Sequence, residues 1–238
     1  PLMFFFFKEY LVWTDKPKLQ LIRGLILLTA NISFFYSISV ISLPKALTLA
    51  FVAPLVVTAF SPFFLGESVG YRRWTAVIIG FIGSLVVIRP GFVEINLASL
   101  AALGTGIMYG FYLIITRKLS TSDNPLLTLL LTGVVGAIIA TIFMPFVWVS
   151  PTFNQWSIMA AIGLFACIGH LFIILSLKYA DASKLAPFSY FEIVTNIIIA
   201  YYFFSDFPDN WTFLGLFIIV FSGIYISRRE NIVKSMRI

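Results

Sequence analysis

Residues Lys178 to Asp209 read KYADASKLAPFSYFEIVTNIIIAYYFFSDFPD, and this stretch decides the fold. It contains a hydrophobic span long enough to cross a bilayer, for which a helix needs roughly 20 residues. Charged residues bracket the stretch at both ends, and one carboxylate, Glu192, lies inside it. Hydrocarbon offers no water to an ionised group, so a carboxylate at membrane depth costs a few kcal/mol unless something compensates it. Glu192 is therefore the first candidate functional residue.

The composition extends this interpretation to the whole chain. Of the 238 residues, 60% are hydrophobic and only 11% are charged, and the mean hydropathy is +1.00. A soluble domain carries about 25% charged residues, so it could not hide this much apolar surface. The apolar runs are continuous and do not alternate, which argues against membrane strands. We predict an all-α polytopic membrane protein.

Several functional classes are disfavoured by the same sequence. Cys167 and His170 are the only residues of their types, so neither a disulfide framework nor a metal site is expected. The net charge of +6 does not indicate nucleic-acid binding, because basic residues in membrane proteins gather on one face of the bilayer. No nucleotide-binding loop is present, and no cofactor is predicted.

Hydropathy divides the chain into membrane spans. Residues Pro1–Trp13 look like the end of a helix that begins earlier. Eight further spans are predicted at 21–41, 46–65, 72–89, 97–116, 125–148, 156–177, 184–204 and 211–227.

Orientation follows from the lysines and arginines. Placing the connector at 14–20 in the cytoplasm puts all but two of the 16 basic residues on that side. Lys45 and Arg89 are the two that remain outside. This bias predicts a cytoplasmic C-terminus with a tail at 228–238.

The chain also contains a repeat. Residues 42–89 and 182–228 each hold a proline-containing start, an apolar run, an acidic turn and a glycine-containing helix. The charge assignment gives the two copies opposite orientations, which is typical of secondary transporters with a midplane substrate site. We expect repeats at 1–90 and 97–227 in a ten-helix, five-plus-five fold, with about one and a half helices missing at the front.

Three segments resemble a known family: GESVGYRRWTAVIIGFIGSLVVIRPG, DASKLAPFSYFEIV and FFSDFPDNWTFLG. They are similar to the paired EamA domains of the drug/metabolite transporter superfamily. Gly169 and His170, together with APFSYFE and SDFPD, resemble bacterial members that carry S-adenosylmethionine or riboflavin, and members of unassigned substrate. The resemblance implies a multi-pass carrier of the bacterial inner membrane that works by alternating access.

Spacing places two ionisable side chains at one depth. Glu192 follows Lys184 by eight residues, and His170 precedes Lys178 by eight, so both lie about 12 Å from the same boundary. A Glu192–His170 pair could share a proton, bind a cationic or hydrogen-bonding ligand, or join two helices. For His170 alone, simple helix packing remains an alternative.

Other candidate substrate-binding residues lie near this level. Asn196 is one helical turn beyond Glu192, and Asn31 is near mid-depth in its span. Tyr109 and Tyr112 share a helix face, where they either stack on a planar or cationic ligand or pack between helices. We also expect Pro54, Pro145 and Pro187 to interrupt their helices.

Together these features predict a transporter of a small organic metabolite: a cofactor-like, nucleoside-like, amino-acid or amine solute. An intramembrane enzyme and a nonspecific channel are the alternatives, but the spans show neither a catalytic cluster nor a ring of charges. The energy coupling stays open, and the protein is expected to be a monomer or a homodimer.

Overall fold

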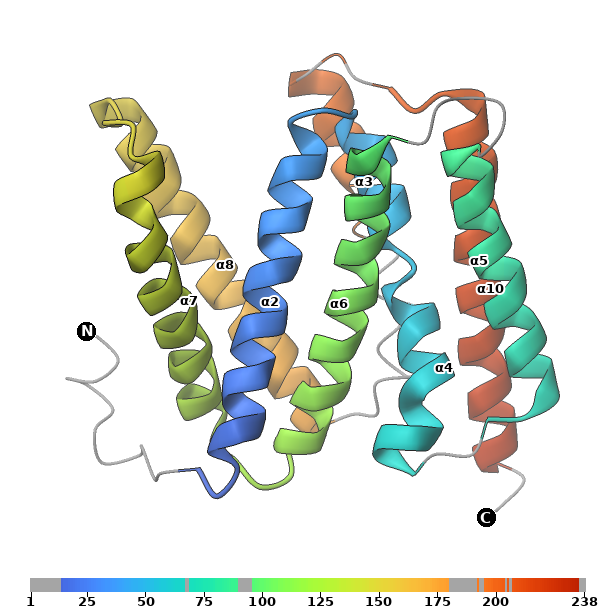
Figure 1. Cartoon of the computed structure of the whole chain (residues 1–238). Coiled ribbons are helices and arrows are strands. Elements are labelled where there is room, and N and C mark those ends of the chain that lie inside the picture. The colour runs from blue at the N-terminus through green and yellow to red at the C-terminus, as the bar shows by residue number, and fades with distance from the viewer. Residues whose placement is uncertain are drawn as a thin grey trace. The chain divides into compact units, whose positions relative to one another are not determined.

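The computed structural model describes residues 14–66, 69–89, 96–179, 192, 195–203, 205 and 207–235. Every regular element among them is helical, which confirms the all-α class (Figure 1). The helices are α2 (Pro17–Ile38), α3 (Leu43–Ala50), α4 (Ala53–Leu65), α5 (Tyr71–Ile88), α6 (Leu97–Leu119), α7 (Pro125–Val147), α8 (Phe153–Tyr179) and α10 (Asn210–Ser235), and residues 195–203 are helical as well.

Five of these helical stretches are long and apolar enough to cross a membrane. Two shorter apolar helices, Trp74–Ile88 and Asn210–Tyr225, accompany them. The polytopic membrane character predicted from composition is therefore confirmed. The five stretches are Pro17–Ile38, Leu43–Leu65, Leu97–Leu119, Pro125–Val147 and Phe153–Tyr179.

Helix boundaries match the predicted spans best where a capping residue marks them. Asn124 caps α7, accepting a hydrogen bond from the Leu126 N–H at 2.9 Å, and Pro125 occupies the first turn. The predicted interruption at Pro145 is wrong, because α7 continues to Val147. Pro187 lies outside the described residues.

The last helix is longer than predicted. α10 continues to Ser235, beyond the predicted end of its span at 227.

The span predicted at 46–65 is two helices. α3 ends at Ala50 and α4 begins at Ala53, so the chain breaks at Phe51 and Val52. Pro54 lies in the first turn of α4 and has no N–H to donate to the carbonyl of Ala50, four residues earlier. The expected interruption at Pro54 is confirmed.

By its contacts the chain forms two compact units. Unit 1 comprises Pro1–Leu25 and Ile115–Ala180, and unit 2 comprises Ile26–Ile114 and Asp181–Ile238. Helices α2 and α6 each contribute residues to both units. This grouping does not report on sequence repeats, so the predicted repeat boundaries stay a prediction.

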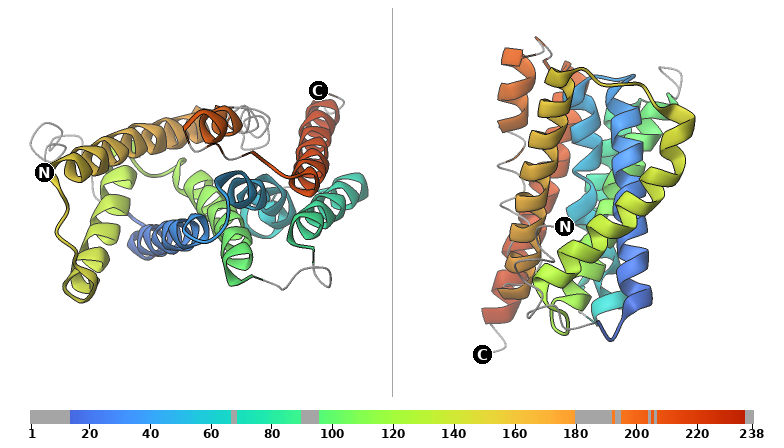
Figure 2. Two further views of the ribbon diagram at one scale, coloured as in Figure 1. Left: turned by 90° about the horizontal axis from the view of Figure 1, so that it is seen from above. Right: turned by 90° about the vertical axis from the view of Figure 1, so that its left-hand side faces the viewer.

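In unit 2, α5 and α10 pack side by side and run antiparallel (Figures 1 and 2). The two helices approach at facing glycines: a Cβ on Gly83 would lie 3.0 Å from the carbonyl oxygen of Gly215, and a Cβ on Gly215 would lie 2.6 Å from that of Gly83. Small residues permit such close approach between membrane helices. A buried core joins this pair to α4 and to the two residues that precede it. It is formed by Phe51, Val52, Leu55, Ala59, Ala76, Val77, Leu216 and Ile219.

In unit 1, α7 and α8 form a helical hairpin (Figure 1). Two hydrogen bonds connect the end of α6 to the end of α8. Arg117, in the last turn of α6, donates to the carbonyl of Leu177 at 2.6 Å, and the hydroxyl of Ser120, directly after α6, donates to the same oxygen at 3.2 Å. These bonds satisfy a carbonyl that a helix end leaves without an intrahelical partner.

Candidate functional site

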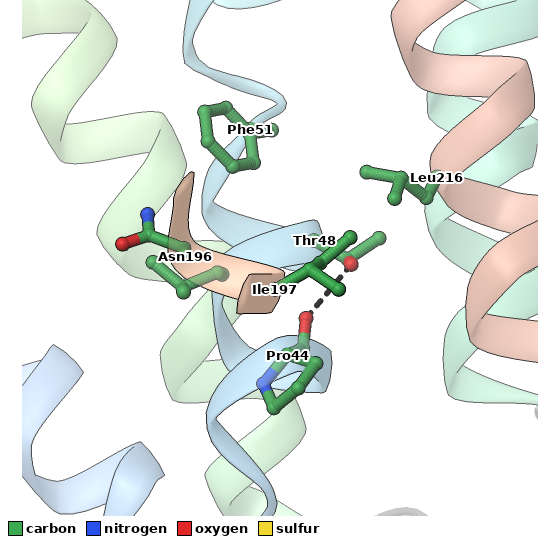
Figure 3. Close-up of a pocket in the computed structure, with 7 residues that line it drawn as sticks. Pro44, Thr48, Phe51, Asn196, Ile197 and Leu216 are labelled. Carbon is green, nitrogen blue, oxygen red and sulfur yellow. Dashed lines mark hydrogen bonds between the residues drawn. The ribbon is translucent and has the colours of Figure 1, made fainter. Parts of the chain in front are cut away.

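A small pocket in unit 2 lies beside the α3–α4 break (Figure 3). It has space for about one water molecule. α3 and the break supply four of its lining residues, the segment 195–203 supplies two, and α10 supplies one. They are Pro44, Leu47, Thr48, Phe51, Asn196, Ile197 and Leu216.

The α3 side of the pocket is one face of a helix. Pro44, Leu47, Thr48 and Phe51 follow the three- and four-residue spacing that places side chains on the same side. The Thr48 hydroxyl donates to the Pro44 carbonyl at 2.8 Å, so its donor is satisfied within the helix. The oxygen retains lone pairs and can still accept a hydrogen bond. The wall is therefore apolar, with one acceptor.

On the other wall of the pocket, Asn196 is hydrogen-bonded to Glu192, the carboxylate predicted to be functional. The Asn196 amide donates to Glu192 Oε1 at 3.5 Å, as their four-residue spacing leads one to expect. Asn196 lines the pocket directly, whereas Glu192 is exposed. Glu192 and Asn196 therefore form a polar pair whose amide end borders the cavity.

The two predicted tyrosines lie together on α6. Their rings stack with centroids 5.5 Å apart and planes 19° apart. Tyr112 is fully buried and Tyr109 is half-buried. Asn31 is exposed on α2. Because both tyrosines belong to α6, their stacking is a contact within one helix. A ligand role for these three residues and the packing of the tyrosines between helices both stay predictions.

His170 is half-buried on α8, within electrostatic range of Arg23. It belongs to unit 1, whereas Glu192 belongs to unit 2. The predicted Glu192–His170 pair therefore stays a prediction.

Unit 1 contains a buried polar cluster that the sequence patterns do not predict. Arg23 is one of the basic residues that the charge pattern predicts on the cytoplasmic side, yet it lies inside α2 with its side chain fully buried. Its Nε donates to the Thr116 hydroxyl at 2.7 Å, and its guanidinium also donates to the Thr128 carbonyl at 3.1 Å and to the Thr132 hydroxyl. Oxygen acceptors on α6 and α7 thus surround the buried cation.

The same cluster continues to the connector between α6 and α7. Gln20 donates to Asp123 at 2.7 Å, and Thr14 donates to the same carboxylate oxygen. Burial alone raises the pKa of Asp123, but hydrogen bonds from Thr14, Gln20 and Ser122 and the charge of Lys16 outweigh burial, so the pKa lies below its ordinary value. No short sequence motif predicts this cluster, because the residues that pair in it are about a hundred positions apart in the sequence.

A second missed cluster lies in unit 2, where α5 ends and α10 begins. Arg89 forms an ion pair with Asp209, and its guanidinium lies 6.0 Å from the ring centroid of Trp211. Lys45, in the first turn of α3, lies within electrostatic range of both charges. Although burial alone raises the pKa of Asp209, bonds from Thr212 and the Arg89 cation hold it below its usual value. Among the described residues, no group of His, Cys, Asp and Glu could hold a metal ion.

Known proteins resemble this chain in sequence and in fold. One curated relative, the S-adenosylmethionine uptake transporter of Rickettsia felis, is 27% identical over all of this chain and 80% of its own length. The riboflavin transporter of Vibrio cholerae is 29% identical over 79% of this chain and 63% of its own length. A solved crystal structure aligns with a TM-score of 0.64 at 19% identity, covering 90% of this chain and 76% of the other, and so shares its fold.

The EamA-like transporter family matches residues 1–89 and again 96–228, which together make up nearly the whole chain. With membrane-length helices and relatives named as metabolite transporters, this match identifies a multi-pass membrane transporter of small molecules rather than an enzyme. The chain belongs to the EamA-like transporter family.

Proposed function

We propose that this protein carries a small organic metabolite across the bacterial inner membrane by alternating access. The observation that carries this proposal is the pocket where a broken membrane helix faces Asn196 and its partner Glu192. Broken helices and rare intramembrane carboxylates are the features from which transporter sites are built.

The chemistry of the pocket supports an organic solute with a polar group. The walls contributed by Leu47, Phe51 and Leu216 suit an apolar or ring-shaped portion, while the Asn196 amide and the Thr48 oxygen suit hydrogen-bonding atoms. The relatives named as carriers of S-adenosylmethionine and riboflavin support a cargo of cofactor size. His170, Tyr109, Tyr112 and Asn31 remain proposed members of the wider site.

The present pocket holds about one water, so it must widen to admit such a solute. Alternating access provides this widening, since each half of an inverted repeat moves against the other. Two observations support the repeat: one family pattern matches both halves of the chain, and its glycine-containing helices α5 and α10 run antiparallel. The charge bias supports a cytoplasmic C-terminus.

Uptake into vesicles tests the proposal. Purified protein reconstituted in vesicles is screened against S-adenosylmethionine, riboflavin, amino acids and organic amines. A carrier shows uptake that saturates with concentration and that is stimulated by the same solute trapped inside. Uptake that rises linearly with concentration would instead indicate a channel, and conversion of the solute into product would indicate an enzyme.

The role of Glu192 is tested with the solute found in that screen. Glu192→Gln keeps the shape and removes the charge, so we expect uptake to fall on the order of tenfold, the cost of losing a charged hydrogen bond. The dependence of uptake on pH should flatten at the same time. Asp15→Asn, at an exposed position outside the helices, is the matched control and should behave as wild type. Wild-type uptake and pH response in Glu192→Gln would remove Glu192 from the mechanism.

A further inference from the structure

The two basic residues that the charge pattern leaves outside come together in the structure. Lys45 lies in the first turn of α3 and Arg89 directly follows α5, and both lie close to Asp209 at the start of α10. All three belong to unit 2. Basic side chains are disfavoured on the outer side of a membrane protein. Lys45 and Arg89 are the only two basic residues predicted on the outer side, and they lie close together. Their presence there therefore needs a local explanation.

Among the residues that the structure describes, the charges at this place do not balance. Asp209 supplies one negative charge, and Arg89 takes it in an ion pair. Lys45 is half-buried, and among the described residues its ammonium forms neither a hydrogen bond nor an ion pair. The Nε of Arg89 is buried and likewise has no partner in the described part of the chain. Two cationic side chains therefore retain donors that nothing described here satisfies.

Such an arrangement is costly unless a ligand completes it. A partly desolvated cation without a partner loses hydration, and two neighbouring cations repel one another. An oxyanion would reverse both effects, since charge-assisted hydrogen bonds from Arg and Lys are the strongest that side chains make. We propose that Lys45 and Arg89 form a binding site for an oxyanion group, a carboxylate or a phosphate.

The arginine is held in place before any ligand arrives. Arg89 ends α5 in the left-handed conformation, φ 58°, with its N–H donating to the Leu85 carbonyl at 2.8 Å. Its guanidinium is fixed on one side by Asp209 and lies over the Trp211 ring. A donor whose position is already fixed loses less entropy when a ligand binds.

The proposed site adjoins the pocket along the chain. Lys45 follows Pro44, which lines the pocket, and both belong to the first turn of α3. The oxyanion could belong to a solute on its way to the pocket or to a lipid headgroup at the membrane surface. Both sources present the same oxygen atoms to the two cations.

Binding is measured on the purified protein without any transport step, so a negative result leaves the proposed function standing. Thermal unfolding in detergent is followed while inorganic phosphate replaces chloride at constant ionic strength. Wild type should be stabilised with saturation. Lys45→Gln should weaken the apparent affinity about tenfold, the effect of losing one charge-assisted bond. Lys118→Gln, an exposed lysine at the end of α6, is the matched control and should respond as wild type.

A second arm separates the two sources. The protein is reconstituted in vesicles of phosphatidylcholine with and without phosphatidylglycerol, and the phosphate titration is repeated. The site binds lipid if phosphatidylglycerol competes with phosphate in wild type and this competition disappears in Lys45→Gln. The site binds a solute if phosphatidylglycerol leaves phosphate binding unchanged. The proposal is overturned if neither anion stabilises wild type. It is equally overturned if Lys45→Gln is less stable but keeps the wild-type response, because Lys45 would then be paired within the chain.

Discussion

Asp123 shows how much a single side chain can depend on distant partners. It lies in the connector before α7 and accepts hydrogen bonds from Thr14, Gln20 and Ser122. These donors favour the charged carboxylate and lower its pKa below the ordinary 3.8, even though burial opposes them. The ionised Asp123 is thus part of what joins the chain before α2 to the α6–α7 connector.

The lowered pKa sets the direction of a pH effect. A carboxyl whose folded pKa is below its unfolded pKa adds stability above the unfolded value and loses it as pH falls through the folded value. We therefore expect the free energy of unfolding to decline as the pH is lowered through and below about 4. Unfolding measured in detergent across this range should show a smaller decline for Asp123→Asn. An identical decline in both proteins would contradict the assignment.

Arg23 is the other residue in this cluster that a substitution can probe. Its Nε and terminal nitrogens reach separate acceptors on α6 and α7, a geometry that the single ammonium of lysine cannot reproduce. Arg23→Lys should lower the free energy of unfolding by about 1–3 kcal/mol, the cost of unmade buried hydrogen bonds. Arg72→Lys, at an exposed arginine, should change it little. Equal effects of the two changes would contradict a structural role for Arg23.

At the scale of elements, the α5–α10 contact depends on the absence of two side chains. A Cβ on Gly215 would collide with the Gly83 carbonyl and a Val87 methyl, and backbone atoms cannot move aside cheaply. The two helices would have to separate and give up packing along their length.

Gly215→Ala should therefore destabilise the protein by about 1–3 kcal/mol, as overpacking does. Gly133→Ala on α7 is the matched control, because a Cβ there meets nothing within 4 Å. It should leave stability unchanged or raise it slightly, since alanine has the higher helix propensity. Thermal unfolding of both variants checks the difference, and a stable Gly215→Ala would mean that the crossing is looser than described.

Sequence patterns predicted the helix boundaries accurately where a capping residue or a proline marks them. Hydropathy and the Asn124–Pro125 cap predicted α7 to within one residue at its end, and Pro54 predicted the break before α4. The predicted start at 21 is too late for α2, because the helix begins at Pro17. Gln20 and Arg23 look like boundary residues in a hydropathy profile, yet partners on α6, α7 and their connector allow them to be buried.

At the scale of the whole molecule, the family and the membrane class followed from composition and motifs, whereas the polar clusters did not. Lys45, Arg89 and Asp209 are far apart in the sequence, and only the folded chain brings them together. Glu192 and Asn196 could be paired in advance because four residues of helix fix their spacing. Contacts made by helical periodicity are predictable from one sequence, and contacts made by tertiary folding are not.

The predicted orientation of the molecule can be checked with single cysteines. Thr121 lies in the α6–α7 connector and Ser150 in the α7–α8 connector, and both are exposed. In a Cys167→Ser background, a membrane-impermeant maleimide should label Ser150→Cys on intact cells. Thr121→Cys should react only after permeabilisation, because its connector belongs to the basic, cytoplasmic side. The reverse pattern would invert the topology.

The break between α3 and α4 has a geometric consequence for solute entry. With eight residues, α3 is a rod about 12 Å long whose covalent attachment on the α4 side is the two-residue break at Phe51 and Val52. A tilt of about 20° pivoting there would carry its far end about 4 Å, comparable to the thickness of an aromatic ring. Pro44 lies near the moving end of this rod and Thr48 lies close to the break, so a tilt away from Asn196 would widen the one-water space mainly on the Pro44 side.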